Sequence, residues 1–329
     1  MATEGLRIGI IGAGGFARTH FILLSRMPDV HIVAACDTKE NALRVAVEEF
    51  AVPGRYNDYR KLLEEADVDA VYVAVSPRAM FGITMDVIAS GKHVFAEKPL
   101  GSNIEQTRAL VAAAETAGIK TAVGVNRRYC AVIRKAKEVV EQRGPISGVL
   151  GEFHKNCAET LYGMSILHCD GLHALDALRY IGGDVASVHA QADRWYRSSG
   201  WEGLNNVFHA MIRFESGASG IFIANRQGGA RREYFEIHGS DISAYIYTPN
   251  RAEIYRAGVS RPEIIRGEEL TGSSDPLVTY GYEAESRDFI DAILNDGVSQ
   301  TNFADNLKTM LLCDQINAGD HVERVEAGR

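Results

Sequence analysis

The sequence has little cysteine and no long apolar run, and each absence argues against a class of protein. Its five cysteines, at positions 36, 130, 157, 169 and 313, are odd in number and form no C-x-x-C pair. That pattern is untypical of a disulfide framework or a zinc site and favours a reducing, cytoplasmic setting. No apolar run approaches the roughly 20 residues that cross a bilayer. Strand-like sequence begins by Leu6, which leaves no room for a signal peptide.

A concentrated positive charge is also missing. The 329-residue chain has 35 Lys and Arg against 43 Asp and Glu, for a formal net charge of −8. Its basic residues gather only into doublets such as Arg127-Arg128 and Arg231-Arg232. This argues against nucleic acid or an anionic membrane as a partner. The chain is longer than one compact core usually covers, so two domains are expected.

The first part of the chain, residues 1–125, alternates apolar strand-like runs with helical segments. The runs after the opening one are VHIVAACD, VDAVYVAVSP, KHVFAEKP and KTAVGVN. Strands that are apolar throughout are typical of a parallel sheet covered by helices on both faces. The sequence therefore predicts an α/β fold with an N-terminal, doubly wound parallel sheet.

The pattern changes in residues 126–329. Helices are expected near 129–142, 171–181, 283–295 and 303–316, and a strand in GPISGVLGEFHKN. Between 185 and 258 the apolar residues recur at every second position, as in VFHAMIRFES and ASGIFIANR, with Gly and Ser turns between the runs. Such runs indicate an antiparallel sheet. This part is predicted to be a C-terminal α+β domain.

A glycine-rich turn follows the first strand. Gly12, Gly14 and Ala17 form G-x-G-x-x-A between a strand and a helix, with Gly15 and Phe16 inside the turn. Gly12 permits the tight turn, and Gly14 lets the backbone approach a pyrophosphate. The small Ala17 lets helix and strand pack closely, and the helix N-terminus offers amide donors. The alternative is a turn with only a folding role.

An acidic residue ends the second strand in register with this turn. Asp37 lies 20 residues after Ala17, where a carboxylate can accept hydrogen bonds from both ribose hydroxyls. The same charge repels a 2′-phosphate, so NAD is favoured over NADP. Lys39, two residues later, moderates that preference.

Four stretches resemble the glucose–fructose oxidoreductase / inositol 2-dehydrogenase (Gfo/Idh/MocA) family. They are IGIIGAGGFARTH, SGKHVFAEKPL, VGVNRRY and HALDALRY. The resemblance covers most of the chain in order, and E-K-P after the fourth strand is its most specific mark. It implies a Rossmann domain, a second domain with a large, open, mostly antiparallel sheet that binds substrate, and bound nicotinamide cofactor. It also implies redox chemistry at a sugar or cyclitol carbon, and homodimers or homotetramers built through that sheet.

Lys98 is the first candidate catalytic residue. It ends the fourth strand, and ligands of open parallel sheets bind beyond the carboxyl ends of the strands. Pro99 restricts the backbone of Lys98. A lysine beside a substrate hydroxyl can stabilise alkoxide charge and relay the proton, which is the role the resemblance implies. Glu97 is expected to be a scaffold carboxylate or a cofactor contact. The alternative for Lys98 is a solvated strand end.

The segment ILHCDGLHALDALRY supplies the second candidate, His173, as acid/base or substrate ligand. In relatives an aspartate lies four residues before this histidine. Here that position is Cys169, and the acid is Asp170. On a helix Asp170 still shares a face with His173 and can orient it. The alternatives are Asp170 as a helix N-cap and His173 as a structural residue. No metal is expected from this single cluster.

The sequence therefore predicts an NAD(H)-dependent oxidoreductase acting on a carbinol or keto carbon of a sugar, sugar derivative or cyclitol. The residues expected to contact cofactor are Gly12, Gly14, Gly15, Phe16, Ala17, Asp37, Ser76, Pro77, Glu97, Lys98 and Asn126. Those expected to contact substrate are Lys98, Arg127, Asp170 and His173. Two alternatives are a glycoside hydrolase that uses bound NAD for transient oxidation and a non-catalytic dinucleotide sensor.

Overall fold

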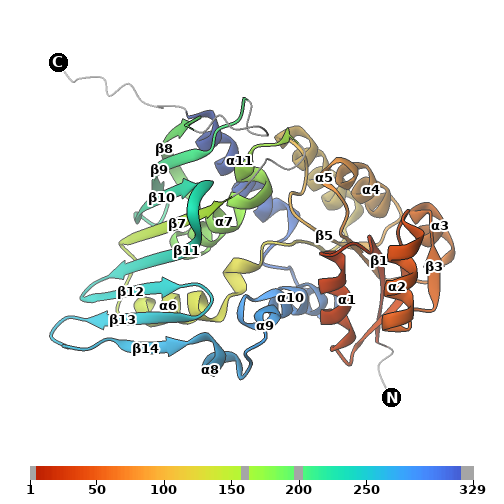
Figure 1. The fold of residues 1–329 in the computed structure, drawn as a ribbon, viewed down its shortest axis with the longest axis horizontal. Helices are drawn as coiled ribbons and strands as arrows, with labels where there is room; N and C mark the ends of the chain where they lie inside the picture. The colour runs from red at the N-terminus through yellow and green to blue at the C-terminus, as the bar shows by residue number, and fades with distance from the viewer. Residues whose placement is uncertain (1–4, 157–162, 196–202, 320–329) are drawn as a thin grey trace. The chain divides into compact units, whose positions relative to one another are not determined.

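The computed structural model describes residues 5–156, 163–195 and 203–319. The chain forms two compact units (Figure 1). The first comprises residues 1–124 and 283–307, and the second comprises residues 125–282 and the chain from Lys308 onward. The expected division after residue 125 did not include the return of 283–307 to the first unit. Amphipathic helices do not reveal from sequence which core they join.

The first unit is a six-stranded parallel sheet in the order β3-β2-β1-β4-β5-β6, with helices on it. Its strands are β1 (Leu6–Ile11), β2 (Val30–Cys36), β3 (Gly54–Tyr56), β4 (Ala70–Val73), β5 (His93–Ala96) and β6 (Thr121–Val123). Its helices are α1 (Ala17–Ser25), α2 (Glu40–Phe50), α3 (Tyr59–Glu65), α4 (Pro77–Ala89), α5 (Ile104–Ala117) and α10 (Tyr282–Leu294). The predicted doubly wound sheet is confirmed. The order reverses between β1 and β4, which is where such sheets bind ligands.

An aromatic group explains why α10 joins this unit. The rings of Tyr72 on β4 and Phe95 on β5 stack with centroids 4.5 Å apart. Phe289 of α10 meets both rings edge-on at 5.8 Å. All three side chains are fully buried, so α10 closes one side of the core.

The second unit contains an eight-stranded sheet in the order β14-β13-β12-β11-β7-β10-β9-β8. Its strands are β7 (Gly148–Asn156), β8 (Val185–Asp193), β9 (Val207–Phe214), β10 (Ser219–Asn225), β11 (Gln227–Gly239), β12 (Ile242–Tyr247), β13 (Arg251–Arg256) and β14 (Glu263–Arg266). The pair β7–β10 is parallel and the other neighbours are antiparallel. The expected mostly antiparallel sheet is confirmed.

Helices cover one face of this sheet. They include α6 (Ala131–Glu141), which packs on β11, β12 and β13, and α7 (Leu172–Gly182), which packs on β7 and β10. The short helix α8 (Gly267–Thr271) contacts β14, and α9 (Pro276–Thr279) contacts α8. The helix α11 (Phe303–Ala318) begins in the first unit. On β9, Phe208, Ala210, Ile212 and Phe214 are buried while the residues between them are exposed. The period-2 pattern of the sequence thus marks a half-buried strand.

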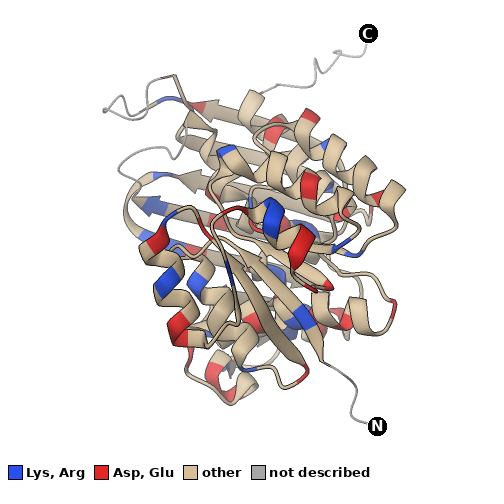
Figure 2. Ribbon diagram, turned by 90° about the vertical axis from the view of Figure 1, so that its right-hand side faces the viewer, with Lys and Arg blue, Asp and Glu red and all other residues tan. Residues whose placement is uncertain are grey.

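Along the described part of the chain, Lys and Arg are interspersed with Asp and Glu in the view of Figure 2. Among the helices of the described residues, none is long and apolar enough to cross a membrane.

Candidate active site

The glycine turn after β1 has the geometry of a dinucleotide cradle. Gly12 has φ +111°, and a Cβ there would lie 2.2 Å from the carbonyl oxygen of Ala74, so only glycine fits. At Gly14 and Gly15 a Cβ would meet nothing within 4 Å, so this part of the turn is open to a ligand. Helix α1 begins at the buried Ala17 directly after the exposed Phe16. The turn and helix start therefore fit a pyrophosphate.

Asp37 lies against this turn. One carboxylate oxygen accepts a hydrogen bond from the backbone N–H of Ala13 at 2.7 Å, and the other accepts from that of Lys39 at 2.8 Å. The acid that ends β2 is thus held beside the glycine turn, as the spacing predicts. A carboxylate in this position suits the ribose hydroxyls of NAD.

The loop after β4 completes the edge of the cradle. The backbone N–H of Ala74 donates to Ile11 O at 2.8 Å, which ties this loop to the end of β1. Ser76 is the N-cap residue of α4, without a side-chain capping bond, and Pro77 is the first residue of the helix. Contacts of these two residues with a cofactor remain a prediction.

Lys98 follows β5 at the same carboxyl edge of the sheet. Its side chain is half-buried, and the Lys98–Pro99 bond is cis. Glu97 Oε2 accepts a hydrogen bond from the backbone N–H of Lys98 at 3.2 Å, while Glu97 Oε1 lies 2.9 Å from His20 Nε2. Glu97 and His20 are 6% and 1% exposed. These contacts are those of a carboxylate that fixes the backbone at Lys98.

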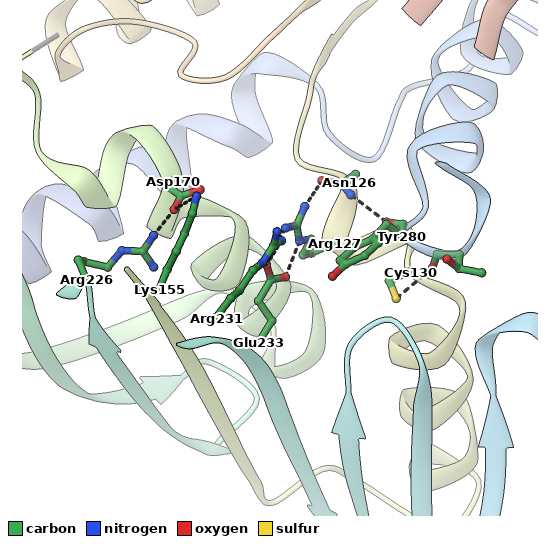
Figure 3. Close-up of polar contacts among 10 residues, drawn as sticks. Asn126, Arg127, Cys130, Lys155, Asp170, Arg226, Arg231, Glu233 and Tyr280 are labelled. Carbon is green, nitrogen blue, oxygen red and sulfur yellow. Dashed lines mark hydrogen bonds and ion pairs between the residues drawn. The ribbon is translucent and has the colours of Figure 1, made fainter. Parts of the chain in front are cut away.

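A buried ionic cluster stands at the start of the second unit (Figure 3). Arg127 donates to both carboxylate oxygens of Glu233 at 2.8 Å and to Asn126 Oδ1 at 2.7 Å. Asn126 in turn donates to the carbonyl oxygen of Tyr280 at 2.8 Å. Arg231 also contacts Glu233, from the rim. The side chain of Arg127 is 4% exposed. Its contacts are with Glu233 and with Asn126, and the bond to Asn126 Oδ1 orients that amide.

The electrostatics of this cluster favour its charged state. Burial alone would lower the pKa of Arg127, but the Glu233 carboxylate outweighs burial and raises it. Burial alone would raise the pKa of Glu233, but the guanidinium groups of Arg127 and Arg231 hold it below its usual value. The pair therefore stays ionised despite its burial.

The histidine segment departs from a regular helix. Residues Leu167–Gly171 form a π-helical turn, and α7 follows from Leu172. Single π-helical turns occur frequently at functional sites. Asp170 lies inside this turn, so the N-cap alternative is wrong: the N-cap residue of α7 is Gly171, without a side-chain bond. His173 is the second residue of α7 and is 6% exposed.

Asp170 binds two cations, one from β7 and one from the turn between β10 and β11 (Figure 3). Lys155 Nζ lies 3.3 Å from its Oδ2, and Arg226 donates to the same oxygen. Arg226 is fully buried, donates to the carbonyl oxygen of Phe153 at 2.9 Å and lies over its ring at 4.5 Å. A π-helical turn has more residues per turn than an α-helix, so it changes which side chains share a face. The three-residue spacing of Asp170 and His173 is therefore not evidence that they share one.

Two neighbouring pairs complete the surroundings of α7. Arg128 donates to both carboxylate oxygens of the fully buried Asp176 at 2.7 and 2.5 Å. His168 Nε2 lies 2.8 Å from Asp314 Oδ1, and burial lowers the pKa of His168. Among the described residues, no group of three or more His, Cys, Asp or Glu side chains could hold a metal ion.

Several residues of these clusters were not predicted. His20 had a signal, because it occupies a position of the apolar face of α1 together with Ala17, Phe21 and Leu24. Lys155, Arg226 and Glu233 had none, because the partners Asp170 and Arg127 are remote in the sequence. Arg231 pairs with Glu233 two residues later, and nothing in the sequence marked that pair as part of a buried cluster.

Comparison with known proteins identifies both parts of the chain. A family model described as "Oxidoreductase family, NAD-binding Rossmann fold" matches residues 6–125, and one described as "GFO/IDH/MocA C-terminal domain" matches residues 134–245. Levoglucosan dehydrogenase of Pseudarthrobacter phenanthrenivorans is 26% identical over 95% of both chains. Myo-inositol 2-dehydrogenase of Thermotoga maritima is 28% identical over 68% of this chain and 69% of its own.

The fold is also found among solved structures. An oxidoreductase from Agrobacterium radiobacter in complex with NAD+, L-tartaric acid and magnesium superposes with a TM-score of 0.85 at 23% identity, covering 98% of each chain. The resemblance first drawn from short motifs is confirmed, and the glycine turn and Asp37 fit the NAD that the family model names. The chain belongs to the GFO/IDH/MocA family of NAD-binding oxidoreductases.

Proposed function

We propose that the protein transfers a hydride between NAD(H) and a carbinol or keto carbon of a sugar, sugar derivative or cyclitol. The main support is Lys98, held by the buried Glu97–His20 pair at the sheet edge that also carries the glycine turn and Asp37. The similar dehydrogenases named for levoglucosan and myo-inositol support this substrate class.

NAD, when bound, supplies the hydride acceptor of the reaction. The backbone amides of the glycine turn would hold its pyrophosphate, and Asp37 its ribose. The Lys98 side chain, as the amine, would take the hydroxyl proton of the substrate while the carbinol hydride goes to NAD+ and the carbonyl forms. In the reverse direction the ammonium group would hydrogen-bond to the carbonyl oxygen, stabilise the negative charge that develops there and return the proton to it.

His173 is proposed as the second group at that oxygen, because an imidazole can take or give a proton near neutrality. Asp170, fixed by Lys155 and Arg226, is proposed to orient it. Asn126 is proposed to line the cofactor. Arg127, whose observed contacts are with Asn126 and Glu233, remains a proposed substrate contact.

The test is a Lys98→Met variant, screened with the wild type against sugars and cyclitols by the absorbance of NADH. We expect the substitution to lower kcat by about 10²- to 10⁴-fold, the usual contribution of an acid–base group. NADH affinity should stay within about threefold, because the phosphate and ribose contacts lie elsewhere. Lys135→Met, which removes a lysine on α6 that pairs with Glu138, is the matched control and should leave kcat unchanged. Full activity in Lys98→Met would rule out the proposed chemistry.

The same screen separates the alternatives. Glycoside cleavage without net change in NADH would indicate the hydrolase. NADH binding without turnover of any compound would indicate the sensor.

NAD should be preferred to NADP because of Asp37. A cytoplasmic location and a homodimer or homotetramer through the second sheet remain predictions, the latter testable by sedimentation.

A further inference from the structure

Among the described residues, two ionic clusters of the second unit each contain two cations and one carboxylate (Figure 3). Asp170 is shared by Lys155 and Arg226, and Glu233 is shared by Arg127 and Arg231. Together the two clusters carry four positive and two negative charges. This local excess is notable in a chain whose formal net charge is −8.

The strand register brings the outer cations of both clusters to one place. On β7 and β11, His154 pairs with Arg232 and Asn156 pairs with Gln227. Only Lys155 lies between the paired residues on β7, whereas residues 228–231 lie between them on β11. Arg231 adjoins Arg232 and Lys155 adjoins His154, so the two cations flank the same paired position, beside the shift in register.

Both cations project on the helix-covered face. Lys155 lies two residues after the buried Phe153, and Arg231 lies two residues before Glu233, which pairs with Phe153. Side chains two residues apart on a strand share a face. Figure 3 shows Lys155 and Arg231 extending on the same side of the sheet as Asp170. Asp170 precedes His173 by three residues, so this face carries the proposed catalytic segment.

Burial separates the four cations into two kinds. The side chains of Arg127 and Arg226 are 4% and 0% exposed, whereas those of Lys155 and Arg231 are 38% and 50% exposed. The buried guanidinium groups already bind the two carboxylates, so the outer cations share acceptors that are partly neutralised. An ammonium group has three N–H donors and a guanidinium five, more than one shared carboxylate takes up.

We infer that the substrate carries an anionic group, bound between Lys155 and Arg231, in addition to the hydroxyl or keto group that reacts. This inference rests on the proposed oxidoreductase function and narrows its substrate class to acidic sugars, meaning sugar carboxylates or phosphorylated sugars. Arg231 supplies a planar fork that suits either anion, and Lys155 supplies a second positive charge.

The test measures binding of matched ligands to the NADH-loaded protein by calorimetry. The acid and neutral pairs are D-glucuronate with D-glucose, D-gluconate with D-glucitol, and galactarate with galactitol; D-glucose 6-phosphate separates phosphate from carboxylate recognition. In at least one set the anionic ligand should bind tenfold more tightly than its neutral partner. Raising the salt concentration should reduce that preference.

Arg231→Gln and Lys155→Gln should each weaken binding of the anionic ligand about tenfold more than binding of its neutral partner, and so remove most of the preference. Arg251→Gln is the matched control, because Arg251 donates to Glu253 two residues later on β13 as Arg231 does to Glu233. Equal or absent binding of every acidic ligand, or a preference that survives both substitutions, would overturn the inference. Hydride transfer on neutral polyols alone would overturn it and leave the proposed function standing. Binding of an acidic ligand without hydride transfer to any compound would contradict the proposed function and leave the inferred anion site standing.

Discussion

The backbone at Lys98 is fixed by buried neighbours of the first unit. Glu97 spans the site, with one oxygen at His20 Nε2 and the other at the backbone N–H of Lys98. Gly124 leaves the room for this carboxylate, since a Cβ there would lie 2.7 Å from Glu97 Oε1. The position of Lys98 therefore depends on a glycine remote from it in the sequence.

Gly124→Ala should lower both the stability of the protein and its kcat. The added methyl group must displace a carboxylate that His20 holds in a buried place, and such overpacking costs about 1–3 kcal/mol. We expect a lower midpoint of urea unfolding and a fall in kcat with NADH affinity nearly unchanged.

The control is Gly82→Ala in α4, where a Cβ would meet nothing within 4 Å. An alanine in mid-helix should be neutral or stabilise by about 0.5–1 kcal/mol. Wild-type kcat in Gly124→Ala would show that the Glu97 carboxylate does not set the geometry of Lys98.

At the scale of elements, α7 lies close to β7 because β7 has a glycine at the contact. A Cβ at Gly151 would lie 3.0 Å from two carbon atoms of Leu178, which is fully buried. Since α7 carries His173, this contact sets the distance from the sheet of the segment that is proposed to be catalytic. The buried Arg128–Asp176 pair fixes the same helix.

Gly151→Ala should push α7 away from β7 and lower both stability and kcat, at a cost of about 1–3 kcal/mol. Leu178→Ala alone should cost about 2–5 kcal/mol through the cavity that it leaves. In the double variant the new methyl group occupies part of that cavity, so the two losses in the free energy of unfolding should be less than additive.

Gly148→Ala on the same strand is the control, because its Cβ would meet neighbours only at 3.7 Å or more. It should leave stability within about 0.5 kcal/mol of the wild type. Strict additivity of Gly151→Ala and Leu178→Ala would mean that this contact does not hold the helix.

At the scale of the whole molecule, the chain crosses between units more than once. Residues 283–307 return to the first unit, where Phe289 packs on Tyr72 and Phe95. The returning segment also covers the edge strand β6: Val123 N–H donates to Thr301 O at 2.9 Å, and Phe303 N–H donates to Thr121 Oγ1 at 3.0 Å. An uncovered edge is prone to aggregation.

A fragment of residues 1–125 should therefore fold poorly, although it contains the entire predicted nucleotide-binding motif. Joining residues 1–124 through a Gly/Ser linker to residues 283–307 should restore a cooperative thermal transition and NADH binding within about tenfold of the full chain, because it restores the buried aromatic group. Circular dichroism measures the thermal transition, and fluorescence titration measures NADH binding. A cooperative transition in 1–125 at the temperature of the joined fragment would contradict this.

Local chemistry made part of this protein predictable from its sequence. The strands of the first sheet are short apolar runs, the glycine turn and Asp37 are separated by a fixed spacing, and the second sheet shows period-2 runs on strands such as β9. Each signal arises between residues close together in the chain, where backbone sterics and side-chain period act directly. The short strand β3 and the helix α3 were missed because three and seven residues give too little pattern.

Only the tertiary structure decided which remote side chains meet. Glu97 meets His20 from 77 residues away, Arg127 meets Glu233 from 106 residues away, and Asp170 meets Arg226 from 56 residues away. It also decided that the segment before α7 takes a π-helical turn and that α10 returns to the first core. The physical reason is that apolar period and turn chemistry specify each element, whereas burial of charge requires partners that only the packing of elements brings within hydrogen-bonding distance.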